Sequence, residues 1–405
     1  MRVSAYPLVD AEVAAGLVLD HTSFLGHELV PLGECLGRAA TEDVRAPASL
    51  PADPVSAVDG FAVRAADAGQ TLRVLGESAA GRPFVGQVEA GTAARILTGG
   101  VLPGGADCVA MFEDVRVDGE TVSVPAGLRA GTNFHAPGAD VREGELVIPA
   151  GTKLGPAEIG LAAALNLPRL RVGRRPRVAL MSTGDELVEL GGSLGRGQIT
   201  DSNRWALLAA LREAGADVRL LGIAPDEPEP LRKLVSTALA DADVLVTSGG
   251  VSVGTHDLVK PLLESIGTVH VGRVKLKPGK PFTFATLDSG RVAFGLPGFP
   301  VSSLVTFEVF VRPALRKMQG YAQLQRPLLR VRMGFDAQAT AERTEYHRVT
   351  LKKEGPDLVA FTTGSQSSSR LMSLAGAHAL VRVPPGDQGL KAGSFTEALV
   401  LALPA

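Results

Sequence analysis

Residues 246–257, VTSGGVSVGTHD, decide the fold, because an apolar run changes there abruptly into glycines, small hydroxyl side chains and a His-Asp pair. Glycine lets the backbone turn sharply, and it lets successive backbone N–H groups approach an anion. The stretch is typical of a buried strand that ends in a tight turn. For this loop alone, a turn that needs glycine only for its geometry is as good an interpretation as a ligand site.

The sequence around this stretch repeats a pattern of strand, turn and helix. The apolar runs RVALMSTGDEL (177–187) and VRLLGIAP (218–225) precede it, and residues 201–216 and 229–242 have helical patterns. Strands that alternate with helices of this length imply right-handed crossovers and a parallel sheet covered on both faces. We therefore predict a doubly wound α/β domain over residues 169–318.

The regions on either side have different sequence patterns, which predict further domains. Short alternating runs broken by glycine and proline predict an inserted β-rich domain at 45–141. Strand patterns return in a C-terminal, barrel-like β domain at 319–405. Residues 1–44 and 142–168 predict a discontinuous, helical linker domain. The predicted class is therefore a multidomain combination of α/β and β structure.

The N-terminal segment predicts an amphipathic helix. Its apolar residues Val9, Val13, Leu17 and Val18 recur at helical spacing. We expect residues 143–167 to return and pack beside this helix.

Composition and charge argue against several classes of function. The 405 residues include 41 lysines and arginines against 43 acids, a net charge of −2, so no strong field favours nucleic acid or an anionic membrane. Cys35 and Cys108 are too few for a disulfide framework and lack metal-ligand spacing. The sequence shows neither the apolar core of a signal peptide nor a run long enough for a membrane span. We expect a cytoplasmic protein with no nucleic-acid or membrane partner.

Three acids, Glu186, Asp226 and Asp257, fall just beyond the ends of predicted strands. Ligands of open parallel sheets lie beyond these carboxyl ends. The chain has no GxxxxGK[ST] phosphate loop and no GxGxxG dinucleotide motif here, but carboxylates suit Mg²⁺ bridging to a phosphate. A helix cap or a solvated loop charge would explain any one of the acids alone.

A basic stretch follows at residues 273–282, RVKLKPGKPF, with Arg273, Lys275, Lys277 and Lys280. Strand alternation would place the first three on one face, and a proline-glycine turn would present the fourth. We expect these cations to face a polyanion in the crevice, although lysines that guard an edge strand are the simpler alternative. GLPGFPVSS (295–303) then ends a strand and opens a helix, which is a second possible anion site.

Asp59 precedes a glycine in SAVDGFAV (56–63), within the β-rich region. From its chemistry alone, this Asp-Gly pair is best interpreted as a hairpin turn.

Eight motifs follow one another along nearly the whole chain: LPADPVSAVDGFAV (50–63), RILTGG (95–100), GADVREGE (138–145), RPRVALMSTGDELV (175–188), GQITDSN (197–203), VTSGGVSVGTHD (246–257), KPGKPF (277–282) and GLPGFPVSS (295–303). With this set the sequence resembles the molybdopterin molybdenumtransferase family, known in bacteria as MoeA and in animals as the E domain of gephyrin. The resemblance implies an elongated homodimer of four-domain subunits, with a crevice between the α/β domain of one subunit and the β-rich domain of the other. It implies a transferase in molybdenum cofactor biosynthesis that uses adenylyl-molybdopterin, molybdate and Mg²⁺ and releases AMP.

The resemblance also assigns residues, and it overturns the structural interpretation of Asp59. The implied catalytic residues are Asp59, Thr98, Glu186 and Asp257, and the implied metal ligands are Glu186, Asp226 and Asp257. The expected substrate- and anion-binding residues are Asp140, Ser248, Gly249, Gly250, Ser252, Gly254, Arg273, Lys275, Lys277, Lys280, Pro297, Pro300, Arg348 and Ser368. Two positions depart from the family pattern: Arg273 stands where lysine can occur, and Phe299 stands where many members have asparagine.

Two other functions compete with this one. A receptor scaffold would need a trimerising domain and a long linker, which these 405 residues do not contain. A molybdopterin adenylyltransferase would consume a nucleoside triphosphate, and the motif around Asp59 argues against it. Beyond the homodimer, we expect transient contacts with the adenylyltransferase and with molybdoenzymes.

Overall fold

The computed structural model describes residues 6–225, 227–251 and 258–403. Residues 169–318 contain a six-stranded sheet in the order β16-β13-β17-β21-β20-β18, and the first four strands are parallel. The strands are β13 (Arg177–Thr183), β16 (Asp217–Ala224), β17 (Val244–Ser248), β18 (Gly267–Val271), β20 (Thr283–Leu287) and β21 (Val292–Leu296). The predicted doubly wound α/β architecture is confirmed.

One edge of this sheet differs from the prediction, because β20 and β18 run antiparallel to their neighbours. Only residues 288–291 join β20 to β21. A connection this short can form a hairpin, whereas a parallel pair needs a crossover of a dozen residues or more.

Helices cover both faces of the sheet and bury a separate apolar core on each. One face carries α3 (Asn203–Glu213), α6 (Pro300–Thr306), the π-helical turn η4 (Phe307–Val311) and α7 (Arg312–Met318). The other face carries α4 (Pro228–Leu239) and α5 (Val259–Ser265). Within the described residues, no helix is long and apolar enough to cross a lipid bilayer.

The N-terminal helix α1 (Ala11–Asp20) packs on this α/β unit, against α7, η4 and β18. Its buried stripe is Ala11, Ala14 and Val18, whereas Val13 is 55% exposed. The predicted helix therefore exists, but its apolar face was placed wrongly at Val13. The small alanines let α1 approach closely the helices that cover the sheet. Residues 143–167 pack elsewhere.

That returning segment forms a connecting region with residues 27–45. β1 (His27–Pro31) pairs with β12 (Arg169–Gly173), and β2 (Val44–Arg45) pairs with β11 (Leu146–Ile148). The helix α2 (Pro156–Ala164) packs beside the turn η1 (Leu32–Glu34) over a small apolar core. The expectation that residues 143–167 lie beside the N-terminal helix was wrong.

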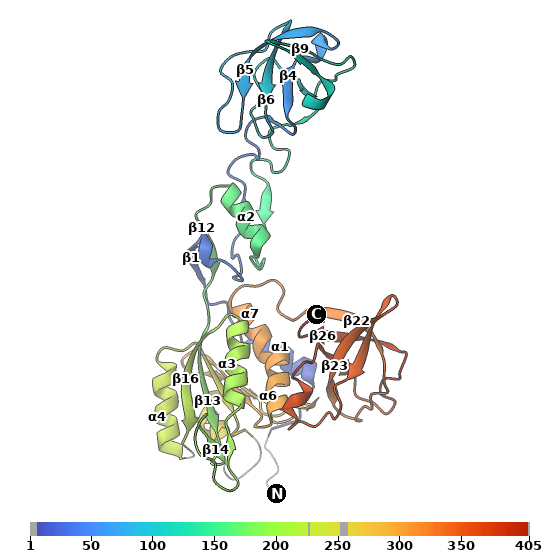
Figure 1. Ribbon diagram of the computed structural model, residues 1–405. Coiled ribbons are helices and arrows are strands. Elements are labelled where there is room, and N and C mark those ends of the chain that lie inside the picture. Colours follow the sequence, from blue (N-terminus) through green and yellow to red (C-terminus); the bar gives the residue numbers. More distant parts are fainter. Residues whose placement is uncertain (1–5, 226, 252–257, 404–405) are drawn as a thin grey trace.

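The β-rich part is a six-stranded sheet in the order β7-β4-β6-β5-β9-β8. Its strands are β4 (Gly60–Val63), β5 (Thr71–Ser78), β6 (Thr92–Ile96), β7 (Cys108–Met111), β8 (Arg116–Asp118) and β9 (Thr121–Ser123). Two short strands, β3 (Val55–Ser56) and β10 (Phe134–His135), precede and follow these strands in the sequence and pair with each other. In Figure 1 this sheet occupies one end of the elongated molecule, and α2 separates it from the α/β sheet.

The C-terminal region closes into a barrel, because β23 pairs with both β24 and β25 and the ring continues through β22 and β26. Its strands are β22 (Leu328–Met333), β23 (Thr344–Glu354), β24 (Asp357–Thr362), β25 (Ala379–Val383) and β26 (Phe395–Val400). The two-residue strand β19 (Leu276–Lys277) adds to β23 from the α/β region. The barrel-like C-terminal domain predicted from the sequence is confirmed.

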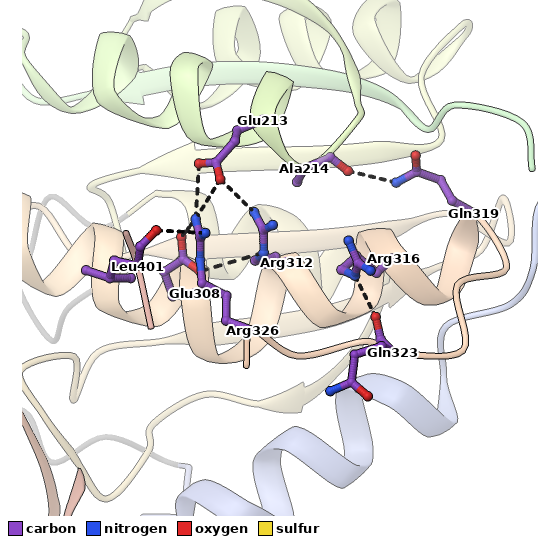
Figure 2. A network of polar contacts seen from close by, with 9 residues as sticks. All are labelled: Glu213, Ala214, Glu308, Arg312, Arg316, Gln319, Gln323, Arg326 and Leu401. Atoms are coloured by element: carbon purple, nitrogen blue, oxygen red, sulfur yellow. Dashed lines mark hydrogen bonds and ion pairs between the residues drawn. The ribbon is translucent and has the colours of Figure 1, made fainter. Parts of the chain in front are cut away.

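A buried polar network attaches the barrel to the α/β unit (Figure 2). Arg326 donates hydrogen bonds to Glu308 on η4 at 2.7 Å, to Glu213 on α3 at 3.0 Å and to the Leu401 carbonyl at 3.2 Å. The side chains of Arg326 and Glu308 are only about a tenth exposed. Removing one member of such a network would leave its partner charged and buried. The network therefore ties the two ends of the barrel, before β22 and after β26, to α3 and η4.

Candidate functional site

A cavity of about 830 Å³ lies at the carboxyl ends of β13, β17 and β21. Five segments of the α/β unit and one barrel loop build it. Its lining residues are Thr183, Gly184, Asp185, Glu186, Leu187, Ile199, Thr200, Asp201, Ser202, Asn203, Ser248, Gly249, Gly250, Val251, Pro281, Pro297, Gly298, Phe299, Pro300, Ser302, Ser369 and Leu371. Six predicted site residues are among them: Glu186, Ser248, Gly249, Gly250, Pro297 and Pro300.

Steric constraints explain why two glycines follow β17. Gly249 and Gly250 have φ of +89° and +68°, which side chains with a Cβ rarely adopt. A Cβ on Gly249 would lie 2.4 Å from the Thr183 carbonyl oxygen. The Gly249 N–H donates to the Leu296 carbonyl at 3.0 Å, so this amide is used to join two strand ends rather than to meet an anion.

Asn203 ties the walls of the cavity together. Its Nδ2 group donates to the Ser248 hydroxyl at 2.8 Å and to the Gly298 carbonyl at 2.7 Å. The first residue of α3 thus connects the turns after β17 and β21. The sequence analysis gave Asn203 no role in the site, although this residue ends the motif GQITDSN (197–203).

The structure describes some of the acidic residues predicted for the site and not others. Glu186 and Asp185 line the cavity beyond the end of β13. Asp201 also lines it, but it is buried and forms an ion pair with Arg204 at 3.2 Å, which gives it a structural role. The predicted site residues Asp226, Ser252, Gly254 and Asp257 lie outside the described residues.

Of the basic stretch, Pro281 alone lines this cavity. Buried residues alternate with partly or fully exposed ones from Arg273 to Lys277, as expected, but only Leu276 and Lys277 form a strand. Lys275 pairs with Asp10 and Lys277 with Glu345, each at 3.1 Å.

Carboxylates of the same chain thus already pair with two of the four cations, and the contact of this stretch with a polyanion stays a prediction. For Arg273 and Lys280, the described residues provide no carboxylate within ion-pair distance.

The two predicted residues of the barrel are not among the lining residues of the cavity either. Arg348 is 1% exposed and donates to Ser373 and to the carbonyls of Tyr346 and Ser367, and burial lowers its pKa to about 10. Ser368 accepts a hydrogen bond from the Val301 N–H through its carbonyl, and its neighbour Ser369 lines the cavity instead. Arg348 thus holds the barrel loop in this structure, and its expected contact with an anion stays a prediction.

A second polar constellation lies in the β-rich sheet. Asp59 directly precedes β4, and Thr98 follows β6. Oδ1 of Asp59 accepts hydrogen bonds from the backbone N–H and from the hydroxyl of Thr98, both at 2.7 Å. Gly60 permits this arrangement, because a Cβ there would lie 2.0 Å from the Ala110 carbonyl oxygen. The structure thus brings together the two residues that the resemblance paired, while Asp140 lies exposed in the loop between β10 and β11.

Thr98 sets the charge state of Asp59. Its backbone N–H and its hydroxyl, with a smaller effect of Arg95, lower the pKa of the Asp59 carboxyl below its usual value. Replacing Thr98 with valine removes the hydroxyl donor and keeps the backbone donor, so the pKa of Asp59 is expected to rise part of the way back. Carbon-detected NMR titration of Asp59 measures this shift. Thr121→Val, whose hydroxyl donates to the Asp118 carbonyl, is the control that should leave the titration unchanged.

The two constellations lie at opposite ends of a single chain. Figure 1 shows β4 and β6 at one end of the molecule and β13 at the other. The convergence expected for Asp59 and the glycine turns therefore does not occur within one copy.

Comparisons with known proteins cover the described domains in order. Residues 9–166 match the MoeA N-terminal region (domain I and II), residues 179–317 match a probable molybdopterin binding domain, and residues 330–401 match the MoeA C-terminal region (domain IV). The chain is 38% identical over 389 residues to a molybdopterin molybdenumtransferase of Nostoc sp., covering 93% of this chain and 89% of the relative. It is 35% identical to gephyrin of Dictyostelium discoideum over 99% of this chain, and it spans 63% of that longer protein.

The fold agrees with a solved relative over the same extent. A crystal structure of the molybdopterin biosynthesis MoeA protein of Pyrococcus horikoshii OT3 superposes with a TM-score of 0.84 at 27% identity, covering 97% of this chain and all of that one. Sequence, domain order and fold thus lead to the same result. The chain belongs to the molybdopterin molybdenumtransferase family.

Proposed function

We propose that the protein inserts molybdenum from molybdate into adenylyl-molybdopterin, cleaves the phosphoanhydride and releases AMP. One observation supports this above the others: the cavity at the strand ends is assembled by the family's own motifs, and hydroxyls, glycine turns and apolar side chains all line it. Ligands of open α/β sheets bind at this place. The size of the cavity, about 830 Å³, is in the range of small-molecule sites.

In the proposed reaction, the side chains of the cavity orient and hold the substrate, and they form no covalent bond with it. Asn203 fixes the Ser248 hydroxyl, which accepts from the amide and keeps its own proton to donate to a phosphate oxygen. Gly249 and Gly250 let the turn after β17 pack tightly against Thr183 and Val259, and this turn forms part of the cavity wall. Catalysis of this kind consists mainly of orientation and charge neutralisation.

Magnesium fits this wall on the chemistry of its donors. The described residues contain no group of three His, Cys, Asp or Glu side chains that could hold a metal by themselves. Mg²⁺ commonly takes one or two carboxylates and completes its shell with substrate phosphates and water. Glu186 would supply such a carboxylate, with Asp226 and Asp257 as the further ligands we propose. When bound, the cation would neutralise charge on the phosphoanhydride.

The working unit we propose is a homodimer in which the Asp59–Thr98 pair of one subunit completes the cavity of the other. The separation of the two constellations in one chain supports this arrangement (Figure 1). A symmetric dimer would repeat the same contact twice and form two equal sites. Transient contacts with the molybdopterin adenylyltransferase and with recipient molybdoenzymes would deliver the substrate and take up the product.

The test is a single-turnover assay with adenylyl-molybdopterin and molybdate, in the presence of Mg²⁺ or of a chelator. We expect AMP release and molybdenum bound to pterin in equal amounts with Mg²⁺, and neither with the chelator. AMP is measured by chromatography and molybdenum by elemental analysis. Consumption of ATP without molybdenum insertion would instead indicate an adenylyltransferase and would contradict the proposal.

A further inference from the structure

The ring of Phe299 is the most exposed aromatic side chain in the described ranges, with 60% of its surface accessible. Aromatic residues make up only 4% of the chain, and Phe282, Phe284 and Phe294 of the same domain are fully buried. Phe299 is instead part of the cavity lining. Among the described residues, no other ring or cation stacks on it.

The backbone that carries this ring is held in place. Pro297 and Pro300 flank it and restrict the chain on both sides. The Gly298 carbonyl accepts the hydrogen bond from Asn203, and the Phe299 carbonyl accepts one from the Ser303 N–H at 2.9 Å, within the first turn of α6. The ring therefore stands on a rigid turn, and little backbone entropy would be lost when a ligand packs on it.

Two further exposed apolar side chains line the same cavity. Ile199 comes from β15 (Ile199–Thr200) and is 55% exposed, and Leu371 comes from the barrel loop and is 37% exposed. Single exposed apolar residues are common and need no explanation. Here, however, three separate segments bring apolar groups to one cavity that hydroxyls and glycine turns also line. Such a mixed lining suits a ligand that carries both a flat, apolar ring and a phosphate.

We propose that Phe299 is a stacking platform for the planar heteroaromatic ring of the substrate, and that it determines affinity for that ring. The inference rests on the proposed function, because adenylyl-molybdopterin carries two such rings, adenine and pterin. The face of Phe299 offers a stacking surface that needs no hydrogen-bond match. Asparagine, which many family members have here, would bind through its amide instead. Phe299 thus recognises the ring through its contact area, whereas asparagine at this position would form hydrogen bonds.

The experiment compares Phe299→Leu with the wild-type protein by isothermal titration calorimetry. Three probes are used: AMP, 6-carboxypterin and inorganic pyrophosphate. Leucine keeps an apolar side chain and loses the stacking face, so the affinity for one ring-bearing probe is expected to fall about 5-fold to 150-fold, as for loss of one base stack. The affinity for pyrophosphate should stay within about twofold, since it has no ring. A loss for AMP assigns the platform to adenine, and a loss for 6-carboxypterin assigns it to pterin.

Two variants serve as controls. Phe299→Tyr keeps the ring and should restore ring binding, and Phe395→Leu removes an exposed ring of the barrel and should change nothing. Equal losses for pyrophosphate and for the ring-bearing probes would show a damaged turn and would overturn the inference. So would unchanged binding of both rings by Phe299→Leu. If the wild-type protein inserts molybdenum and Phe299→Leu binds the rings as the wild-type protein does, only the inference about Phe299 fails. If the wild-type protein binds no ring and inserts no molybdenum, the proposed function fails as well.

Discussion

Replacing Asp59 with alanine is expected to abolish molybdenum insertion and AMP release while the protein stays folded. The Asp59 side chain is exposed, and its hydrogen bonds go to one turn residue, Thr98, so its loss opens no core. The hydrogen bonds from the backbone and hydroxyl of Thr98 lower the pKa of this carboxyl and so favour its charged form. Loss of one positioned catalytic group typically reduces a rate by about 100-fold or more. Single-turnover AMP release measures the effect, and thermal unfolding checks the fold.

The shared site that we propose for a homodimer predicts more than a loss of activity. When Asp59→Ala and Glu186→Ala chains are co-expressed, each mixed dimer contains one site with both defects and one with neither. Random pairing should therefore restore about a quarter of the wild-type activity, although each variant alone is inactive. Asp118→Ala, which removes an exposed acid on β8 of the same sheet, should retain full activity. An active Asp59→Ala protein, or mixtures that recover nothing, would remove the shared site from this account.

Replacing Gly249 with alanine is expected to eliminate substrate binding and to lower stability. The new Cβ would meet the Thr183 carbonyl at 2.4 Å, and backbone atoms cannot move aside as a flexible side chain does. The residue would also have to keep a φ of +89°, or else give up the hydrogen bond from its N–H to Leu296. Strain of this kind costs about 1–3 kcal/mol, so the ends of β13 and β17 should separate and distort the cavity.

Gly191→Ala separates the two causes. Gly191 has nearly the same φ, +87°, but open space where its Cβ would lie. It should therefore show only the conformational part of the destabilisation and retain binding. Urea unfolding gives the free energies of unfolding, and calorimetry with AMP gives the affinities. Equal behaviour of the two variants would mean that the contact with Thr183 is unimportant.

The sequence predicted the residues whose role follows from local chain geometry. Glycines at strand ends must lie at the carboxyl edge of a parallel sheet, so strand order alone was enough to place Gly249, Gly250 and Glu186 at one cavity. The turn of Pro297 and Pro300 could be placed there for the same reason. These predictions depend only on the order of the strands and on the short reach of a turn.

Residues whose role depends on distant partners could not be assigned in this way. Lys277 looks free in the sequence, but the buried carboxylate of Glu345 lies 68 residues further along and pairs with it. Arg348 has the charge of an anion ligand, yet packing of the barrel buries it beneath carbonyls. Asn203 lies in a recognisable motif, but only the positions of Ser248 and Gly298 turn it into a clamp.

The sequence by itself determined the class of each domain and the family, because strand and helix periodicity and ordered motifs are local properties of the chain. The tertiary structure decided which cations already have partners, which face of α1 is buried, and that Asp59 and the cavity lie at opposite ends of one subunit. The physical reason is that ion pairing, burial and separation depend on groups far apart in the chain. Local patterns restrict such groups only weakly.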